Sequence, residues 1–178
     1  MTIRFSLRVA VVLAFGIGTS WALVRDGQPA IAADKPAPDK VAVERTREQI
    51  LMLDDLYKTA VVGISQTYAA QQFDTPAAVV AGAVFDAMKK KGWHEARLVD
   101  ATGKPKRKDN VANTPFEKKA IEAIQGGKKY FEEIGEANGK PVLRAATIVP
   151  AVLKQCASCH NVKEGDLLGA IVYEVPIK

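Results

Sequence analysis

The chain has 178 residues, of which 48% are hydrophobic and 25% are charged, and its formal net charge is +5. This length suits one domain with a hydrophobic core, and it excludes a sensor joined to a separate enzymatic output module. The lysines are spread among acidic residues without interleaved aromatic side chains, so nucleic acid is not expected as a partner.

The N-terminal segment, residues 1–32, has the three parts of an export signal. Arg4 and Arg8 precede an apolar run from Val9 to Val24, and Ala30-Ile31-Ala32 offers a small-residue cleavage site. We therefore predict a signal peptide over residues 1–32, which places the folded part in the periplasm or an equivalent compartment. The stretch from Arg25 to Pro29, between the apolar run and the cleavage site, is unusually long, so an uncleaved membrane anchor is the alternative. Cleavage removes three arginines and one aspartate, which lowers the net charge from +5 to +3.

Residues 33–42 are predicted to be a linker, and two amphipathic helices are predicted between residues 43 and 91. Apolar residues recur every three or four positions from Val43 to about Gln72, which indicates a long first helix. Thr75-Pro76 is typical of a helix start, and Gly92 is typical of a helix end. The long helix lacks a clean heptad repeat, which favours packing against its own domain; a homodimer through this helix is the alternative.

Beyond Gly92, short segments alternate with turn signals. A capping box at Thr114 to Glu117 opens a predicted helix that runs through Ile124, and Asn138-Gly139 predicts a hairpin turn. Pro150 is predicted to start a short helical stretch. Strands are predicted at residues 96–100, 128–134, 142–149 and 167–175. Two helices followed mainly by strands predict an α+β fold.

The short helical stretch carries the sequence Cys156-Ala157-Ser158-Cys159-His160. Two thiols at this spacing can each add to one haem vinyl group, and the adjoining imidazole can bind the iron, so the motif predicts one covalently attached haem c. In this interpretation Cys156 and Cys159 form the thioether bonds, and His160 is the proximal iron ligand.

Three other interpretations of the two cysteines compete with haem attachment. A redox disulfide of thioredoxin type belongs near a βαβ unit, which is not the context here. A structural zinc site needs four ligands, so it would require every cysteine and histidine in the chain, including His94, which lies far from the motif in the sequence. A structural disulfide across so short a loop would be strained.

These features together resemble the PAS-like periplasmic c-type haem domains, which occur as single-haem cytochromes and as sensor domains of chemotaxis receptors and histidine kinases. The resemblance covers roughly residues 43–178. It rests on the helical N-terminal part, on residues 110–117 (NVANTPFE), on Leu143-Arg144-Ala145-Ala146, and on the haem motif followed by Gly169-Ala170-Ile171. In the family pattern R-N-P-x-N-x-P-x-x-x-E an arginine directly precedes the first asparagine, whereas here it is displaced to Arg107, and Val111 replaces the first proline.

The resemblance implies an antiparallel sheet of five or six strands, with the haem against it and a distal side formed by the N-terminal helical region. In some members a cysteine or methionine supplies the distal ligand, but here both cysteines belong to the motif, and no methionine follows His160. The identity of the ligand at the sixth position of the iron is therefore undecided in this interpretation. The candidate ligands for this position are His94, Met88 and Met52. Each has a structural alternative: His94 as a surface histidine, Met88 as a core residue, and Met52 as a residue beside the apolar stripe of its helix.

Arginine side chains are candidate partners for the haem propionates, because a guanidinium group matches a carboxylate in a bidentate manner. Arg144 is the first choice, ahead of Arg97 and Arg107, because it precedes the haem motif most closely in the sequence.

The leading interpretation is an exported single-haem cytochrome that transfers electrons or reports redox state or a diatomic gas, with a redox protein or a small diatomic molecule as its partner. Enzyme activity, such as peroxidase chemistry or oxidation of a small nitrogen compound, is less favoured. It needs an open iron and a general base, for which His94 or Glu95 is available. A haem-bearing subunit of a larger redox complex is a third interpretation, and contact with a membrane is expected only if residues 1–32 are retained.

Overall fold

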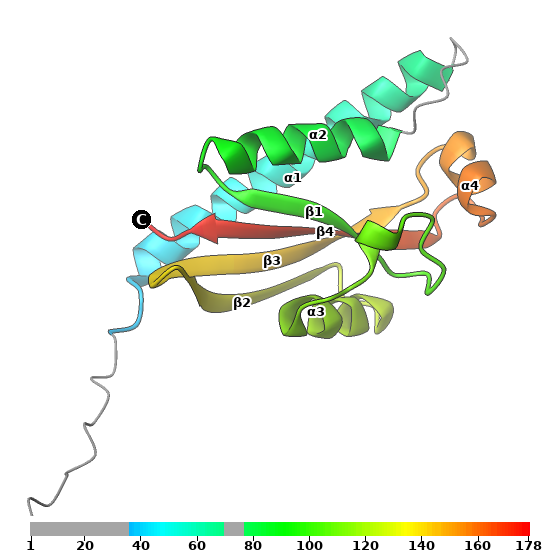
Figure 1. The fold of residues 1–178 in the computed structure, drawn as a ribbon. Helices are drawn as coiled ribbons and strands as arrows, with labels where there is room; N and C mark the ends of the chain where they lie inside the picture. The colour runs from blue at the N-terminus through cyan, green and yellow to red at the C-terminus, as the bar shows by residue number, and fades with distance from the viewer. Residues whose placement is uncertain (1–35, 70–76) are drawn as a thin grey trace, which may run out of the picture. The chain divides into compact units, whose positions relative to one another are not determined.

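The computed structural model describes residues 36–69 and 77–178, which form helices on both sides of an antiparallel sheet (Figure 1). The elements are α1 Lys40–Ala69, α2 Ala77–Lys90, β1 Glu95–Asp100, the 3-10 helix η1 Lys108–Asn110, α3 Pro115–Gln125, β2 Tyr130–Ala137, β3 Lys140–Pro150, α4 Lys154–His160 and β4 Leu167–Pro176. The predicted α+β class with helices first is confirmed. Within these ranges no helix is both long enough and apolar enough to cross a membrane. The predicted signal peptide and the helix start at Thr75-Pro76 lie outside the described residues.

Helix α1 begins at Lys40, three residues before its predicted start, because Asp39 caps it. The Asp39 side chain accepts a hydrogen bond from the Ala42 N–H at 3.2 Å, and its carbonyl accepts one from the Val43 N–H at 3.0 Å. Val43, Ile50 and Tyr57 are buried at intervals of seven residues, which is two helical turns. This spacing places their side chains in one stripe that faces the sheet.

Helix α2 lies beside α1 on the same side of the sheet and contributes Ala81 and Phe85 to the core (Figure 1). It ends at Lys90, and Gly92 has the left-handed φ of 73° that an L side chain rarely adopts. The Gly92 and Trp93 N–H groups donate to the Lys89 and Met88 carbonyls at 2.9 and 3.2 Å. This closed turn leads directly into β1.

The sheet has the strand order β1-β4-β3-β2, with every neighbouring pair antiparallel. The hairpin between β2 and β3 turns at Asn138 and Gly139, whose φ values of 51° and 76° are both left-handed, as a type I′ turn requires. Strand β4 is last in the sequence but central in the sheet. At Gly169, a β-carbon would collide with the Val99 carbonyl of β1, so only glycine fits this close approach of two strands.

Side chains alternate between the two faces of the sheet and form two cores. On the face covered by α1 and α2, Leu143, Ala145, Ile171 and Tyr173 pack against helix residues. On the face covered by α3, Ala146, Ala170 and Val172 pack against Phe116 and other apolar residues of that helix. The sheet therefore separates two layers of helices (Figure 1).

Two expectations about the sheet are corrected by the structure. The described residues form a sheet of four strands, whereas the resemblance implied five or six. Pro150 ends β3 and does not start a helix, because the β3–β4 register shifts between Val149 and Pro150 and accommodates a residue without an N–H donor. The following helix, α4, begins only at Lys154.

Candidate functional site

The predicted haem motif lies on α4, in the connection between β3 and β4, at the end of the sheet where β3 stops and β4 begins (Figure 1). Two backbone hydrogen bonds close the base of this connection. The Ala151 N–H donates to the Asp166 carbonyl at 2.8 Å, and the Gly165 N–H donates to the Ala151 carbonyl at 2.9 Å. The connection is therefore anchored to the end of the sheet.

Helix α4 ends at Asn161, which has the left-handed backbone angles φ 56° and ψ 50°. The Val162 N–H donates to the Ala157 carbonyl at 3.0 Å, which is the six-to-one hydrogen bond of a Schellman motif. The Asp166 carboxylate then accepts from the Lys163 N–H at 2.7 Å. These bonds fix the end of the helix directly after His160.

The three residues of the predicted attachment site share one face of α4. Cys156, Cys159 and His160 stand at positions i, i+3 and i+4, which neighbour one another on a helix surface. Both thiols are free; Cys156 is half-buried and Cys159 is exposed, while Ala157 faces inward. An open depression beside them is lined by Lys154, Gln155, Ser158 and Cys159. Two accessible thiols and an imidazole on one face fit the attachment of a haem.

His94 is not brought to this segment. It directly precedes β1, whose first residue Glu95 pairs with Glu174 near the end of β4, whereas α4 precedes the beginning of β4. The His94 side chain is only 5% exposed, and its Nε2 lies 2.8 Å from the Tyr57 hydroxyl. Burial lowers the pKa of His94, so the imidazole is held in its neutral form. Glu95, the other proposed base, is exposed and pairs with Lys89 at 2.7 Å.

The two methionine candidates also lie away from α4. Met88 is half-buried in the last turn of α2, and its carbonyl accepts from the Trp93 N–H in the turn that leads to His94. Met52 is 61% exposed on α1. Its neighbours Ile50 and Asp54 are buried, so Met52 points away from the sheet.

The arginine candidates for the propionates are engaged in pairs within the chain. The Arg144 Nε donates to Glu174 at 2.7 Å, and its guanidinium also donates to the Glu136 carbonyl at 3.0 Å. Arg107 pairs with Asp109 at 2.7 Å on the surface. The pairing of Arg144 with Glu174 places it toward the end of the sheet that is opposite α4.

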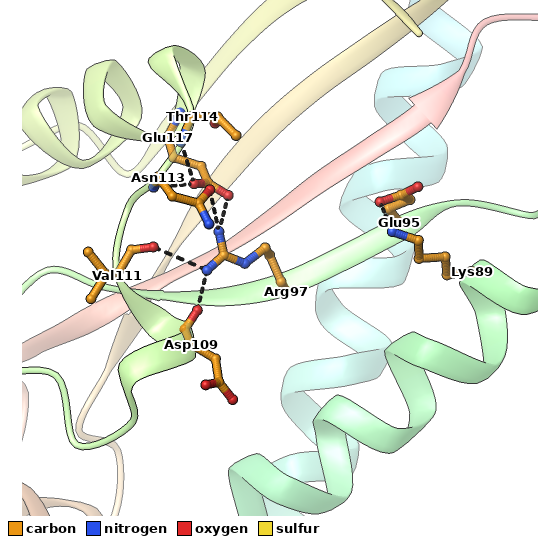
Figure 2. A network of polar contacts seen from close by, with 8 residues as sticks. All are labelled: Lys89, Glu95, Arg97, Asp109, Val111, Asn113, Thr114 and Glu117. Atoms are coloured by element: carbon orange, nitrogen blue, oxygen red, sulfur yellow. Dashed lines mark hydrogen bonds and ion pairs between the residues drawn. The ribbon is translucent and has the colours of Figure 1, made fainter. Parts of the chain in front are cut away.

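Arg97 has a role that the sequence did not reveal. From β1 it donates to the Glu117 carboxylate and to the Asp109 and Val111 carbonyls, and so it holds η1 and the start of α3 against the sheet (Figure 2). Glu117 also accepts from the Asn113 and Thr114 N–H groups at 2.8 and 3.0 Å. Burial alone raises the pKa of Glu117, but these hydrogen bonds outweigh it and hold the pKa below its ordinary value. The capping box was the only sign of this network in the sequence.

A second buried network joins α1 to the sheet. The Asp54 carboxylate accepts from Thr147 at 2.5 Å, from Tyr173 at 3.0 Å and from Lys58 at 2.7 Å. Burial raises the pKa of Tyr173, so its hydroxyl stays protonated and donates to Asp54. No local pattern in the sequence predicted this network, because its partners come from three separate elements.

Comparison with known protein families gives a match to the Tll0287-like family over residues 39–176. The chain belongs to this family. Tll0287-like domains are PAS-like periplasmic haem domains, so the resemblance found in the sequence is confirmed at this level. No curated protein matches the chain. For this Tll0287-like domain, attachment of haem at Cys156, Cys159 and His160 stays a prediction, which the face of α4 supports.

Proposed function

We propose that this Tll0287-like protein is an exported single-haem cytochrome that works in electron transfer or in redox or gas sensing. Cys156 and Cys159 hold one haem c through thioether bonds, and His160 binds its iron. The observation that carries the proposal is the common face of these three residues on α4, in a chain that belongs to a haem-binding family.

The chain's own residues position the group in three ways. The αL turn at Asn161 ends α4 directly after His160 and so fixes the backbone of this residue relative to that of the two cysteines. The hydrogen bonds at Ala151 tether the segment to the sheet. The exposure of Cys159 leaves its thiol accessible for covalent attachment. A bound haem supplies an iron that can change its oxidation state or coordinate a small ligand.

Covalent attachment is tested by producing the protein together with a cytochrome c maturation system. The wild type is expected to gain the mass of one haem that survives denaturation, and its pyridine haemochrome spectrum is expected to show two thioether bonds. Cys156→Ser and Cys159→Ser are each expected to lose one thioether, and the double variant is expected to lose covalent haem.

Ser158→Ala is the matched control, because Ser158 is an exposed residue of the same helix and lies between the two cysteines. It is expected to keep the full haem content. A wild type that matures without covalent haem would contradict the proposal.

A further inference from the structure

The chain contains few side chains that bind haem iron strongly, so each of them can be considered in turn. The sequence holds two histidines, three methionines and two cysteines. These side chains are the usual protein ligands of haem iron in cytochromes. In the proposed function, on which this inference rests, both cysteines become thioethers and His160 takes the proximal position. Met1 lies outside the described residues, which leaves His94, Met88 and Met52.

His94 lies too far along the sheet to share an iron with His160. Metal–imidazole bonds of about 2 Å place two axial donor atoms about 4 Å apart. Glu95, next to His94, pairs with Glu174, while Pro150, before α4, pairs with Leu167. Seven residue steps along β4 separate these two levels, which is roughly 23 Å at the rise of an extended strand. The α4 segment continues beyond that end of the sheet (Figure 1).

Met88 shares the position of His94. It lies in the last turn of α2 and is joined to the turn before β1 by the Trp93 hydrogen bond. Met88 is therefore as far from α4 as His94 is, which excludes it as a ligand of the iron that His160 binds.

The orientation of α1 excludes Met52 as a ligand of the iron. Ile50 and Asp54, two positions before and after it, face the sheet, and a separation of two residues is about 200° around a helix. Met52 therefore lies on the opposite side of α1. Turning it inward requires α1 to roll by about half a turn, which breaks the bonds of Asp54 to Thr147 and Tyr173 and exposes Ile50 and Tyr57.

We infer that the sixth position of the iron is not filled by a histidine, methionine or cysteine from the described part of the chain, and that it binds a neutral diatomic ligand such as carbon monoxide. This property separates the two halves of the proposed function. An iron ligated on both sides by the protein suits electron transfer alone, whereas an iron with one exchangeable position suits gas sensing.

The test uses carbon monoxide as the probe on the matured, haem-loaded protein. The ferric form is expected to be high-spin by paramagnetic resonance, and the reduced form is expected to bind one carbon monoxide per haem with a shift of the Soret band. Met52→Leu, Met88→Leu and His94→Gln are matched variants of similar volume. Each is expected to leave the spin state unchanged and the carbon monoxide affinity within about twofold, a difference below about 0.5 kcal/mol.

A low-spin wild type without added ligand overturns the inference, whether or not one of the three variants converts it to high spin. A carbon monoxide affinity that rises tenfold or more in a variant overturns it too, because that residue then competes for the iron. Failure of covalent attachment is read separately, from the mass of the protein, and counts against the proposed function.

Discussion

At the level of single residues, the burial of His94 decides its chemistry. Its only polar contact among the described interactions is with the Tyr57 hydroxyl at 2.8 Å, and the aromatic rings of Tyr57 and Phe85 pack at 5.0 Å between centroids on the same face of the sheet. A buried imidazole without a carboxylate partner is less stable when charged. His94 is therefore a core residue that joins α1 to the start of β1.

The lowered pKa of His94 makes the stability of the protein depend on pH. The unfolded chain binds a proton on His94 near pH 6.5, whereas the folded chain binds it only at lower pH. The unfolded state then holds more protons, so the free energy of unfolding falls as the pH drops below about 6.5. Above that pH, the neutral His94 makes its full contribution to the free energy of unfolding.

We expect the wild type to lose about 1 kcal/mol more stability than His94→Gln between roughly pH 7.5 and pH 5.5, measured by urea denaturation of the two proteins. Carboxylates and His160 are common to both proteins, so the difference between them isolates His94. Equal losses in the two proteins would show that His94 titrates normally.

At the level of the elements, one arginine links β1 to η1 and to the start of α3. Arg97 reaches from β1 to Glu117 of α3, whose side chain is 4% exposed, and to two carbonyls around η1 (Figure 2). Without the guanidinium, the Glu117 carboxylate stays buried beside two N–H donors only. The buried charge of Glu117 then has no cationic partner, and this destabilises the segment between β1 and α3.

Arg97→Ala is expected to destabilise the fold by about 3 kcal/mol and to speed amide hydrogen exchange in residues 108–114. Lys89→Ala is the matched control, because Lys89 pairs with Glu95 on the surface, where both side chains are more than half exposed. Its expected cost is below about 0.5 kcal/mol. Similar costs for the two variants would show that the Arg97 network adds no more than a surface pair.

At the level of the whole molecule, our proposals assign different tasks to the described domain and to the N-terminal segment. The domain holds the proposed haem site, and residues 1–32 carry the export signal predicted from Arg4, Arg8 and the apolar run. Export is a proposal from the sequence, and haem c attachment depends on it, because the attachment takes place after transport.

The full chain, produced in a Gram-negative host, is expected to accumulate in the periplasm with Ala33 as its first residue, as read by intact mass. Ala32→Phe is expected to block cleavage, since the site requires a small side chain at this position. Wild-type protein that stays in the membrane fraction with residues 1–32 attached would support the anchor instead.

Much of the fold could be predicted from the sequence, because its signals are local. The Thr114 capping box, the turn at Asn138-Gly139 and the stop at Gly92 each depend on neighbouring residues, and the structure shows all three. The end of β3 at Pro150 was misassigned, because only pairing with β4 shows that the residue still belongs to the sheet.

The sequence by itself determined the α+β class and the predicted haem chemistry, because two thiols and an imidazole so close together in the chain need no distant partner. Only the tertiary structure decided which side chains lie together. Asp54, Thr147 and Tyr173 meet across 93 and 119 positions of sequence, while His94, Met88 and Met52 are held away from α4. Strand register and the rotation of α1 set these positions, and both arise from the burial of apolar faces over the whole domain.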